Sequence, residues 1–201
     1  MISMPEMLWS KMLDRLESAP SGCERVAFLD GIRWVGADGV RHGVVTTVTV
    51  PDAELSPGYY RVTPDNMSAA GKHLAVHGLV RLAQVHTHGG KWTGHSADDD
   101  ALAYSQRDGA LSIVLPHNAI HRPLPEDGGI HLRGPTGWRR LAVDEVRQTI
   151  RLVPSCFDFR REPRWNEFQI ATKGRSEANW RLLSRRVKAL WMSLWGRKPT
   201  D

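Results

Sequence analysis

The stretch Leu82–Asp100, LAQVHTHGGKWTGHSADDD, joins a short apolar run to a His-x-His pair, a Gly-rich turn and a helix start. Because side chains alternate between the two faces of a strand, His86 and His88 point the same way. Two imidazoles and a carboxylate from the following helix would leave one ligand position for water, as in catalytic rather than structural zinc sites. The stretch therefore predicts a strand–turn–helix unit that carries a metal site.

The same residues also have a purely structural interpretation. Ser96 and Asp99 have the spacing of a capping box, with Ser96 as the N-cap and Asp99 near the positive end of the helix dipole. A His-x-His pair taken alone often occurs by chance. The joint pattern of two histidines, a serine and an aspartate is much more specific, and the capping role is compatible with metal binding.

The pattern His-x-His, seven residues, Ser, two residues, Asp resembles the JAMM motif of the JAB/MPN (MPN+) metalloprotease family, and residues from about 20 to 150 are similar to its domain. The resemblance implies an α/β (α+β) fold of the MPN/JAB type, in which helices flank a mixed, curved β-sheet as in cytidine deaminases. It also implies a prokaryotic, deubiquitinase-like zinc isopeptidase. Such an enzyme cuts after the C-terminus of ubiquitin or a ubiquitin-like protein.

The family pattern assigns roles to individual residues of this sequence. It makes His86, His88 and Asp99 the ligands of one catalytic Zn²⁺, and it gives Ser96 a part in stabilising the oxyanion. The family also needs a glutamate on an early strand as general base, and Glu24 in ERVAFL matches that place. The strand after Glu24 lacks the glycine that many members carry there. An exposed acid at a strand end is the alternative interpretation of Glu24.

Length and composition indicate one domain with appendages. The chain has 201 residues and ordinary charged and apolar fractions, which is enough to bury a core. We expect an N-terminal helix at 1–19, the metalloprotease domain at 20–154 and a basic, aromatic tail at 155–201. The formal charge of +5 comes mainly from the Arg- and Lys-rich part after residue 139.

Cysteine usage and the N-terminus favour a cytoplasmic protein. Cys23 and Cys156 lie outside any C-x-x-C pattern, and we expect both to be small buried hydrophobic residues in a reducing compartment. The N-terminus has no signal-peptide pattern, and no run approaches 18 apolar residues, so neither secretion nor a membrane-spanning helix is expected.

Hydrophobic periodicity and turn residues predict the order of the elements. Helices are expected at 5–18, 64–77, 97–106 and 144–152, and strands at 24–29, 32–35, 43–50, 79–86, 110–115, 130–132 and 138–143. Thr63 and Pro64 are typical of a helix start. Loops are expected at 51–61 and 116–129, and by analogy with the family they would shape the groove for the substrate tail.

The tail contains a second amphipathic pattern. From Ser176 to Leu194, apolar residues recur at helical spacing with Arg and Lys on the other faces, which predicts a basic amphipathic helix. Packing on the domain or on a partner, such as a protein of the conjugation system, is the main interpretation. Contact with an anionic membrane surface is the alternative. No nucleic-acid-binding module is recognisable, so no nucleic-acid partner is expected.

Other metal-site patterns fit the sequence less well. The metallo-β-lactamase pattern H-x-H-x-D-H is not met, because position 90 is Gly90. An amidohydrolase barrel typically needs about 250 residues. His73 and His77 have the i,i+4 spacing of a helical metal pair but lack the acid of H-E-x-x-H, so we predict surface positions for them.

Two alternatives to a deconjugating enzyme remain. The first is a non-catalytic MPN-type scaffold, whose sequence mark would be the loss of ligands that this chain retains. The second is a peptidase that processes a sulfur-carrier protein related to ubiquitin. We favour deconjugation or maturation in a bacterial ubiquitin-like conjugation system directed against phage.

Overall fold

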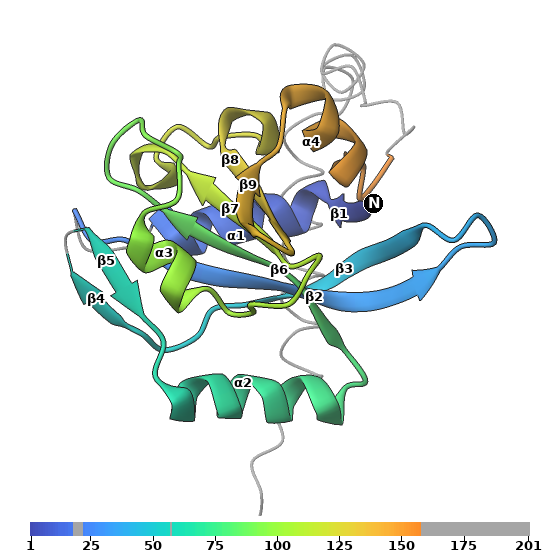
Figure 1. Cartoon of the computed structure of the whole chain (residues 1–201), viewed down its shortest axis with the longest axis horizontal. Coiled ribbons are helices and arrows are strands. Elements are labelled where there is room, and N and C mark those ends of the chain that lie inside the picture. Colours follow the sequence, from blue (N-terminus) through green and yellow to red (C-terminus); the bar gives the residue numbers. More distant parts are fainter. Residues whose placement is uncertain (18–21, 57, 158–201) are drawn as a thin grey trace, which may run out of the picture. The chain divides into compact units, whose positions relative to one another are not determined.

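The computed structural model describes residues 1–17, 22–56 and 58–157 (Figure 1). The compact unit that they form runs from Met1 to Cys156. Its elements, in chain order, are β1 (Ile2–Pro5), α1 (Glu6–Glu17), β2 (Val26–Val35), β3 (Arg41–Thr49), β4 (Glu54–Ser56), β5 (Tyr59–Arg61), α2 (Pro64–Val76), β6 (Val80–Thr87), α3 (Ala97–Leu102), β7 (Leu111–Leu115), η1 (His117–Ala119), η2 (Pro125–Asp127), β8 (Gly129–Gly134), β9 (Gly137–Arg140), α4 (Val143–Thr149) and β10 (Ile150–Val153).

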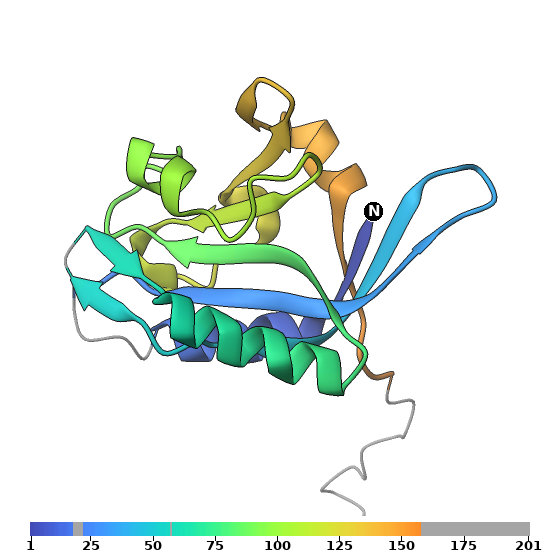
Figure 2. The same ribbon diagram turned by 60° about the horizontal axis from the view of Figure 1, so that its bottom comes forward.

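Eight strands form one curled, mixed sheet in the order β10-β1-β3-β2-β6-β7-β8-β9, while β4 and β5 form a separate hairpin. β6 runs parallel to β7, and β1 runs parallel to both β3 and β10, whereas the other neighbouring pairs are antiparallel. Figures 1 and 2 show the ends of β2 and β3 projecting from the unit as a hairpin. The expected mixed sheet with flanking helices is confirmed.

The central strands are buried because both faces of the sheet are covered. One face packs on the apolar stripe of α1, and this core includes Trp9, Met12, Leu13, Leu16, Leu29, Val85 and Ile113. The other face carries a smaller cluster of Val26, Phe28 and Tyr60, with Leu55 from β4 and Met67 from α2 packed against it. Alternation along β6 therefore points Val85 into the main core and leaves His86 beside Tyr60 in the second layer.

Helices α1 and α2 begin and end close to where the sequence predicts. The Thr63 hydroxyl accepts a hydrogen bond from the Asn66 backbone N–H (3.3 Å), and Pro64 occupies the first helical position. Gly78, at a φ of +64°, follows the C-cap residue of α2. The buried positions of α1 recur at helical spacing, as its sequence pattern indicates.

The loop predicted at 51–61 instead contains the β4–β5 hairpin. Leu55 pairs with Tyr60, and Tyr60 is buried against the second layer. Strands of three residues are too short to show an alternating pattern in the sequence. Pro57 and Gly58 also favour a loop interpretation, so sequence periodicity could not reveal this hairpin.

Helix α3 is shorter than predicted, because it ends at Leu102 rather than near residue 106. Ala103 has extended backbone angles, and the Tyr104 N–H donates to the Gln84 side-chain oxygen at 3.0 Å. This hydrogen bond draws the chain back onto β6, which explains the early end of the helix.

The helix predicted at 144–152 stops at Thr149 and gives way to strand β10. β10 pairs in parallel with β1, so that Ile2 lies beside Ile150 and Pro5 beside Val153. The partners are far apart in the sequence, and each strand has only four residues. A local pattern cannot reveal such pairing, so β1 and β10 are absent from the sequence prediction. Through β1 and α1, the N-terminal segment forms part of the same compact unit as the sheet.

Gly31 lets β2 continue as one strand where the sequence suggests two. The pairing registers of β2 with β3 and β6 both shift next to Asp30. A Cβ atom at position 31 would overlap the carbonyl oxygen of Val44 on β3. Glycine is therefore required for the close approach of these two strands at the irregularity.

The expectation that both cysteines are buried is wrong. Cys23 is half-buried and Cys156 is exposed, and both are free thiols. Cys23 precedes β2 and Cys156 follows β10, so neither lies in an element that packs in the core. Across residues 1–17, 22–56 and 58–157, no helix is both long and apolar enough to cross a lipid bilayer. The amphipathic helix predicted at 176–194 lies outside the described residues.

Candidate metal centre

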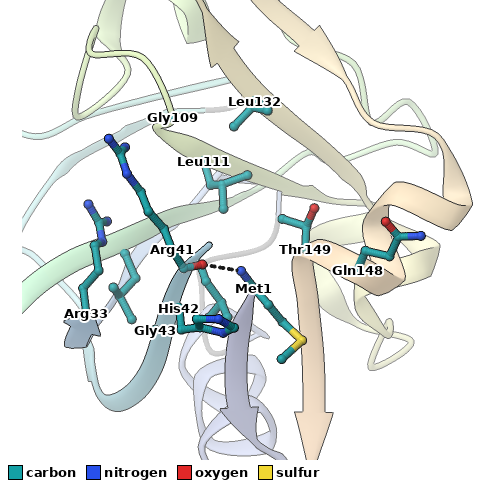
Figure 3. Close-up of a pocket in the computed structure, with 12 residues that line it drawn as sticks. Met1, Arg33, Arg41, His42, Gly43, Gly109, Leu111, Leu132, Gln148 and Thr149 are labelled. Carbon is teal, nitrogen blue, oxygen red and sulfur yellow. Dashed lines mark hydrogen bonds between the residues drawn. The ribbon is translucent and has the colours of Figure 1, made fainter. Parts of the chain in front are cut away.

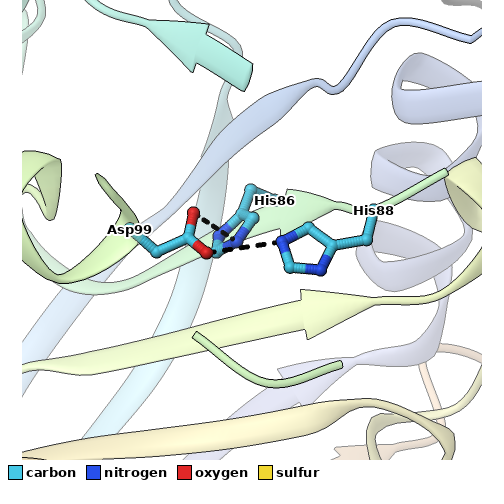
Figure 4. Close-up of side chains that lie close together, drawn as sticks. All are labelled: His86, His88 and Asp99. Carbon is cyan, nitrogen blue, oxygen red and sulfur yellow. Dashed lines mark ion pairs between the residues drawn. The ribbon is translucent and has the colours of Figure 1, made fainter. Parts of the chain in front are cut away.

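Strand β6 and helix α3 bring the predicted ligands together (Figure 4). His86 lies in the last part of β6, His88 directly follows the strand, and Asp99 lies in the first turn of α3. The side chains of all three are buried. The strand–turn–helix unit predicted from the sequence is therefore present, and it places two imidazoles opposite one carboxylate.

The distances suit a single small cation. His86 Nε2 lies 3.2 Å from one oxygen of Asp99, and His88 Nε2 lies 3.4 Å from the other. Ligand atoms bound tetrahedrally at about 2.0–2.1 Å from zinc would lie roughly 3.3 Å from one another. One donor atom from each of the three side chains lies within 4.8 Å of the others, and no second such group exists in the described part of the chain.

The His88 ring is held by the loop that follows it. Its Nδ1 lies 3.0 Å from the carbonyl oxygen of Trp92, which can only accept, so Nδ1 carries the proton. The Trp92 indole stacks on the ring at 5.1 Å and 15°. In the neutral imidazole, Nε2 therefore offers a lone pair toward the Asp99 carboxylate. A proton or a metal ion between these atoms would relieve the repulsion of the facing lone pairs.

His86 is completely buried, and neither ring nitrogen has a hydrogen bond in the described structure. Buried polar atoms without a partner are rare in folded proteins. Burial lowers the pKa of His86, which keeps the ring neutral despite the nearby carboxylate. A neutral imidazole is the form that binds metal ions, so this residue fits a ligand better than a satisfied core histidine.

Electrostatics keep Asp99 ionised. Burial acts to raise the pKa of Asp99, but the neighbouring imidazoles of His86 and His88, together with the backbone N–H of Ser96, lower it far below its usual value. Burial opposes protonation of His88, yet Asp99 and Glu24 raise the pKa of that ring. The cluster thus combines a carboxylate with two imidazoles, which is the donor set of a catalytic zinc site.

Ser96 forms the predicted capping box with Asp99. The Ser96 hydroxyl accepts from the Asp99 N–H (3.0 Å), and the Ser96 N–H donates to Asp99 Oδ2 (2.7 Å). The same hydroxyl donates to Asp99 Oδ2 at 2.8 Å. In this arrangement Ser96 orients the carboxylate. Its role as an oxyanion donor stays a prediction.

Glu24 lies beside the cluster, in the segment just before β2. Its side chain is buried, although the alternative interpretation made it an exposed strand-end acid. Burial raises the pKa of Glu24, while the charge of His88 opposes and that of Asp99 reinforces the shift. The Glu24 N–H donates to the carbonyl of Ser56 on β4 (3.3 Å). The β4–β5 hairpin thus anchors the segment that carries this glutamate.

The loop between β6 and α3 is fixed to β8 and β9 through Thr93. Its carbonyl oxygen accepts from His131 Nε2 at 3.0 Å, and its hydroxyl accepts from Arg140 at 2.8 Å. A Cβ atom at Gly129 would overlap the Thr93 carbonyl oxygen. The loop therefore needs glycine at this position of β8 to reach its place beside the cluster.

Tyr60 and Gln84 also border the site, and neither was singled out in the sequence. The Tyr60 ring lies 5.2 Å from the His86 ring, and its hydroxyl accepts a hydrogen bond from Gln84. The pattern Gln84-x-His86-x-His88 gave a usable signal, because it places polar residues on one face of an apolar strand. Tyr60 lies in a hairpin that the sequence did not reveal.

A cavity of about 310 Å³ opens next to Tyr60, and Phe28, Met67 and Tyr104 contribute to its walls. Residues of β5, the start of α2 and the end of α3 line this cavity. His73 near the end of α2 and His77 at its C-cap are both exposed, as predicted.

No family model matches the sequence. The chain is similar to "Probable metalloprotease y4jG" of Sinorhizobium fredii, with 33% identity over 90 residues that cover 43% of this chain and 55% of that protein. The matched part thus spans little more than half of the relative. The fold is similar to the solution structure of protein DSY2949 from Desulfitobacterium hafniense, with a TM-score of 0.58 and 20% identity over 77% of this chain and 94% of that one. At such identity the likeness shows a shared fold alone.

Proposed function

We propose that this protein is a zinc-dependent peptidase of the JAMM type that cleaves after the C-terminus of a ubiquitin-like protein. The observation that carries the proposal is the convergence of His86, His88 and Asp99 in one buried cluster with Glu24 beside it. The similarity to the metalloprotease-named protein of Sinorhizobium fredii supports a metal-dependent hydrolase in general. The motif spacing supports the finer assignment to the JAMM type and to zinc.

The chemistry follows from the donor set. When bound, zinc supplies a water whose pKa falls from about 15.7 toward about 7, together with a polarised scissile carbonyl. Glu24 takes the proton of the attacking water and passes it to the departing amine nitrogen. Because burial raises its pKa, Glu24 binds a proton more readily than an exposed glutamate, which suits a group that accepts and then returns one.

The remaining residues hold this arrangement. Trp92 fixes the tautomer of His88, and Ser96 orients the carboxylate of Asp99. We assign Ser96 a second task as a hydrogen-bond donor to the oxyanion. A donor of that kind typically contributes about 10²–10³ in turnover. The task requires its hydroxyl to leave Asp99 Oδ2 when substrate binds.

The proposed substrate is an extended C-terminal tail of a ubiquitin-like protein, joined through an isopeptide or a peptide bond. The β4–β5 hairpin and the cavity beside Tyr60 border the cluster and offer surfaces to such a tail. We place the enzyme in a bacterial ubiquitin-like conjugation system with an antiphage role, on the motif resemblance alone. Processing of a sulfur-carrier protein is the alternative substrate choice.

Metal content and cleavage measured together test the proposal. Wild type, His88→Ala and Glu24→Gln are purified, zinc is quantified, and each is incubated with ubiquitin-like protein that carries a C-terminal extension. We expect zinc and chelator-sensitive cleavage in wild type, and neither in His88→Ala. Glu24→Gln should keep zinc but lose about 10²–10⁴ in rate. His73→Ala, an exposed histidine outside the cluster, is the control.

Two results would redirect the assignment. An undiminished rate in Glu24→Gln would remove Glu24 from the chemistry. Stoichiometric zinc without cleavage of any extended or amide-linked ubiquitin-like protein would favour the non-catalytic scaffold.

A further inference from the structure

His95 lies in the loop before α3, and neither the JAMM motif nor the proposed chemistry uses it. Its side chain is only 5% exposed. Its ring lies 5.9 Å from that of the ligand His86, at an interplanar angle of 39°. A buried imidazole next to a metal ligand is costly unless its polar atoms are satisfied, so the partners of His95 indicate its role.

Asp100 fixes one side of the ring. His95 Nδ1 lies 2.8 Å from the Asp100 carboxylate, which accepts only, so Nδ1 carries the proton. In the neutral ring Nε2 is therefore an acceptor. That atom is buried and has no hydrogen-bond partner among the described residues.

Aromatic neighbours prevent the ring from turning away. His131 on β8 stacks on it at 4.0 Å and 16°, and Trp138 on β9 meets it edge-on at 5.1 Å and 61°. His131 is itself held by its hydrogen bond to the Thr93 carbonyl. The position of His95 is therefore set by β8 and β9, independently of the metal ligands.

The complementary atom belongs to His86. His86 Nε2 lies 3.2 Å from Asp99 and faces the proposed metal position. Because a nitrogen that binds a metal carries no proton, the proton of the neutral ring is then on Nδ1. That Nδ1 is also buried without a partner. A metal-bound histidine almost always donates its other N–H to a carboxylate, a carbonyl or a water, and this contact orients the ring. The buried donor and the buried acceptor thus occur on two neighbouring rings.

We propose that His95, held by Asp100, is a positioning residue for the metal centre and serves as the hydrogen-bond acceptor of the His86 N–H, directly or through one water. The inference rests on the proposed metal site. It gives the acidic run of α3 two separate tasks, since Asp99 faces the metal position and Asp100 turns back to His95. The resulting chain Asp100–His95–His86 would fix the tautomer and tilt of the deepest ligand.

The test compares metal binding in His95→Phe, Asp100→Asn and wild type. His95→Phe keeps the aromatic stack but removes the acceptor. Zinc affinity is measured by competition with a chromophoric chelator, and the absorption spectrum is recorded with Co²⁺ in place of zinc. We expect His95→Phe to bind zinc about 10–100-fold more weakly and to shift the Co²⁺ bands, as loss of an outer-shell partner does. His73→Phe, on an exposed ring, should change neither.

The controls separate positioning from folding. Circular dichroism and melting of the metal-free proteins show whether each variant folds. If His95→Phe does not fold, Asp100→Asn decides, because it keeps the shape and weakens the hold on the His95 tautomer. Unchanged zinc affinity and Co²⁺ bands in a folded variant would overturn the inference. Metal binding without peptidase activity would contradict the proposed function and leave this inference standing.

A different cavity, at the other end of the sheet, carries a second and independent inference. It measures about 200 Å³, and Figure 3 shows the side chains around it. Ile2, Leu82, Leu111 and Leu132 give it an apolar floor. Arg33, Arg41 and His42 stand at its rim, and none of the residues that line it is acidic.

Two arginines at the rim lack carboxylate partners. Arg33 and Arg41 lie on one face of the β2–β3 pair, since Arg33 is opposite Gly43 and Arg41 is opposite Val35. One Arg33 nitrogen donates to the Arg81 carbonyl at 2.9 Å, and within the described residues the Arg41 guanidinium has no hydrogen bond or ion pair. Both arginines are exposed, and one anion that contacted both guanidiniums would pair with two positive charges at once.

We infer that this cavity binds a small organic anion with a short aliphatic body. Its head would pair with Arg33 and Arg41, and its body would lie on the leucine floor. Arginine suits carboxylate heads because its planar fork donates two parallel hydrogen bonds. The cavity lies at the end where β6 begins, whereas the metal ligands lie where β6 ends.

The test uses hexanoate as the probe and hexanamide, which lacks the charge, as its control. Backbone amide shifts are followed by NMR during titration of wild type, Arg41→Gln and Arg151→Gln, the last being an exposed arginine outside the cavity. We expect saturable shifts at Gly43 and Gly109 with hexanoate, at least about tenfold weaker binding in Arg41→Gln and no change in Arg151→Gln. Absence of saturation, or equal binding of hexanamide, would overturn the inference.

Discussion

The two ends of strand β6 differ in whether their charged and polar side chains are paired within the chain. At its start, Val80 is 43% exposed, and Arg81 pairs with Asp30 at 3.1 Å while its guanidinium lies 3.6 Å from the centre of the Phe28 ring. At its end, His86 is fully buried and faces a carboxylate. Arg81 and Asp30 neutralise each other's charge, whereas the ring nitrogens of His86 and His88 face the carboxylate oxygens of Asp99 without a cation between them. The difference indicates that the His86 end of the strand is the one organised for a metal ion.

The largest effect is expected from Asp99→Asn, which removes the proposed carboxylate ligand. Zinc affinity should fall by more than about 100-fold, since loss of an outer-shell contact alone costs about 10–100-fold. The matched control is Asp98→Asn, on an exposed residue of the same helical turn. Chelator competition measures both. Equal affinities in the two variants would contradict the assignment of Asp99.

Asp30→Asn, beside the start of β6, should lower the stability of the protein and leave its zinc affinity nearly unchanged. Asp30 is fully buried, and its loss leaves Arg81 without its ion-pair partner. Breaking a buried pair from one side typically costs about 3–5 kcal/mol of unfolding free energy. Urea denaturation should show this loss, while zinc affinity stays within about twofold of wild type. A loss of zinc affinity in proportion to the loss of stability would show that the two ends of β6 do not act independently.

Gly129→Ala should have a smaller effect that reaches the site through the backbone. The added Cβ would overlap the Thr93 carbonyl, so the loop before α3 must move. Overpacking of this kind typically costs about 1–3 kcal/mol. We expect reduced stability together with weaker zinc binding, measured by denaturation and chelator competition. The control is Gly90→Ala, in the same loop, because a Cβ there meets no atom within 4 Å and the backbone has no positive φ.

Near neutral pH the smallest expected effect comes from His131, as a dependence of the unfolding free energy on pH. Burial lowers the pKa of His131 to about 4, against an ordinary value of 6.5. Above pH 6.5 the ring is neutral in both states, so it adds no slope. As the pH falls from 6.5 to 4, His131 is protonated in the unfolded chain but not in the folded protein. The free energy of unfolding therefore decreases.

Denaturation of the metal-free protein between pH 7 and pH 4 measures this slope. His131→Phe keeps the ring stack and removes the titrating group, so its stability should depend less on pH over the same range. An unchanged slope would assign the pH dependence to other groups.

The parts of the fold that follow from local signals were predictable. The two ends of α2 are predictable from capping and backbone geometry at Thr63, Pro64 and Gly78. The structure confirms both ends. The run from Leu82 to Asp100 gives a strand, a turn and a capped helix for the same reason. The convergence of His86, His88 and Asp99 follows from that unit, because strand alternation and the helix start place them together.

The parts that depend on distant pairing were not predictable. β1 and β10 exist because Ile2–Pro5 meets Ile150–Val153, and nothing near either segment in the sequence indicates the other. Tyr60 reaches His86 only through the β4–β5 hairpin, whose three-residue strands show no period. No local pattern in the sequence marks His95, because its role depends on its contacts with Asp100, His131 and Trp138. His131 and Trp138 come from β8 and β9, which are distant in the sequence.

X-ray absorption at the zinc edge of the loaded protein identifies the atoms that bind the metal. We expect one zinc per chain with two imidazole nitrogens and carboxylate or water oxygens at about 2.0–2.2 Å, and no sulfur ligand. In His88→Ala the zinc and its imidazole signature should both be lost. A sulfur shell at about 2.3 Å, which would involve Cys23 or Cys156, or the absence of stoichiometric zinc, would contradict the account.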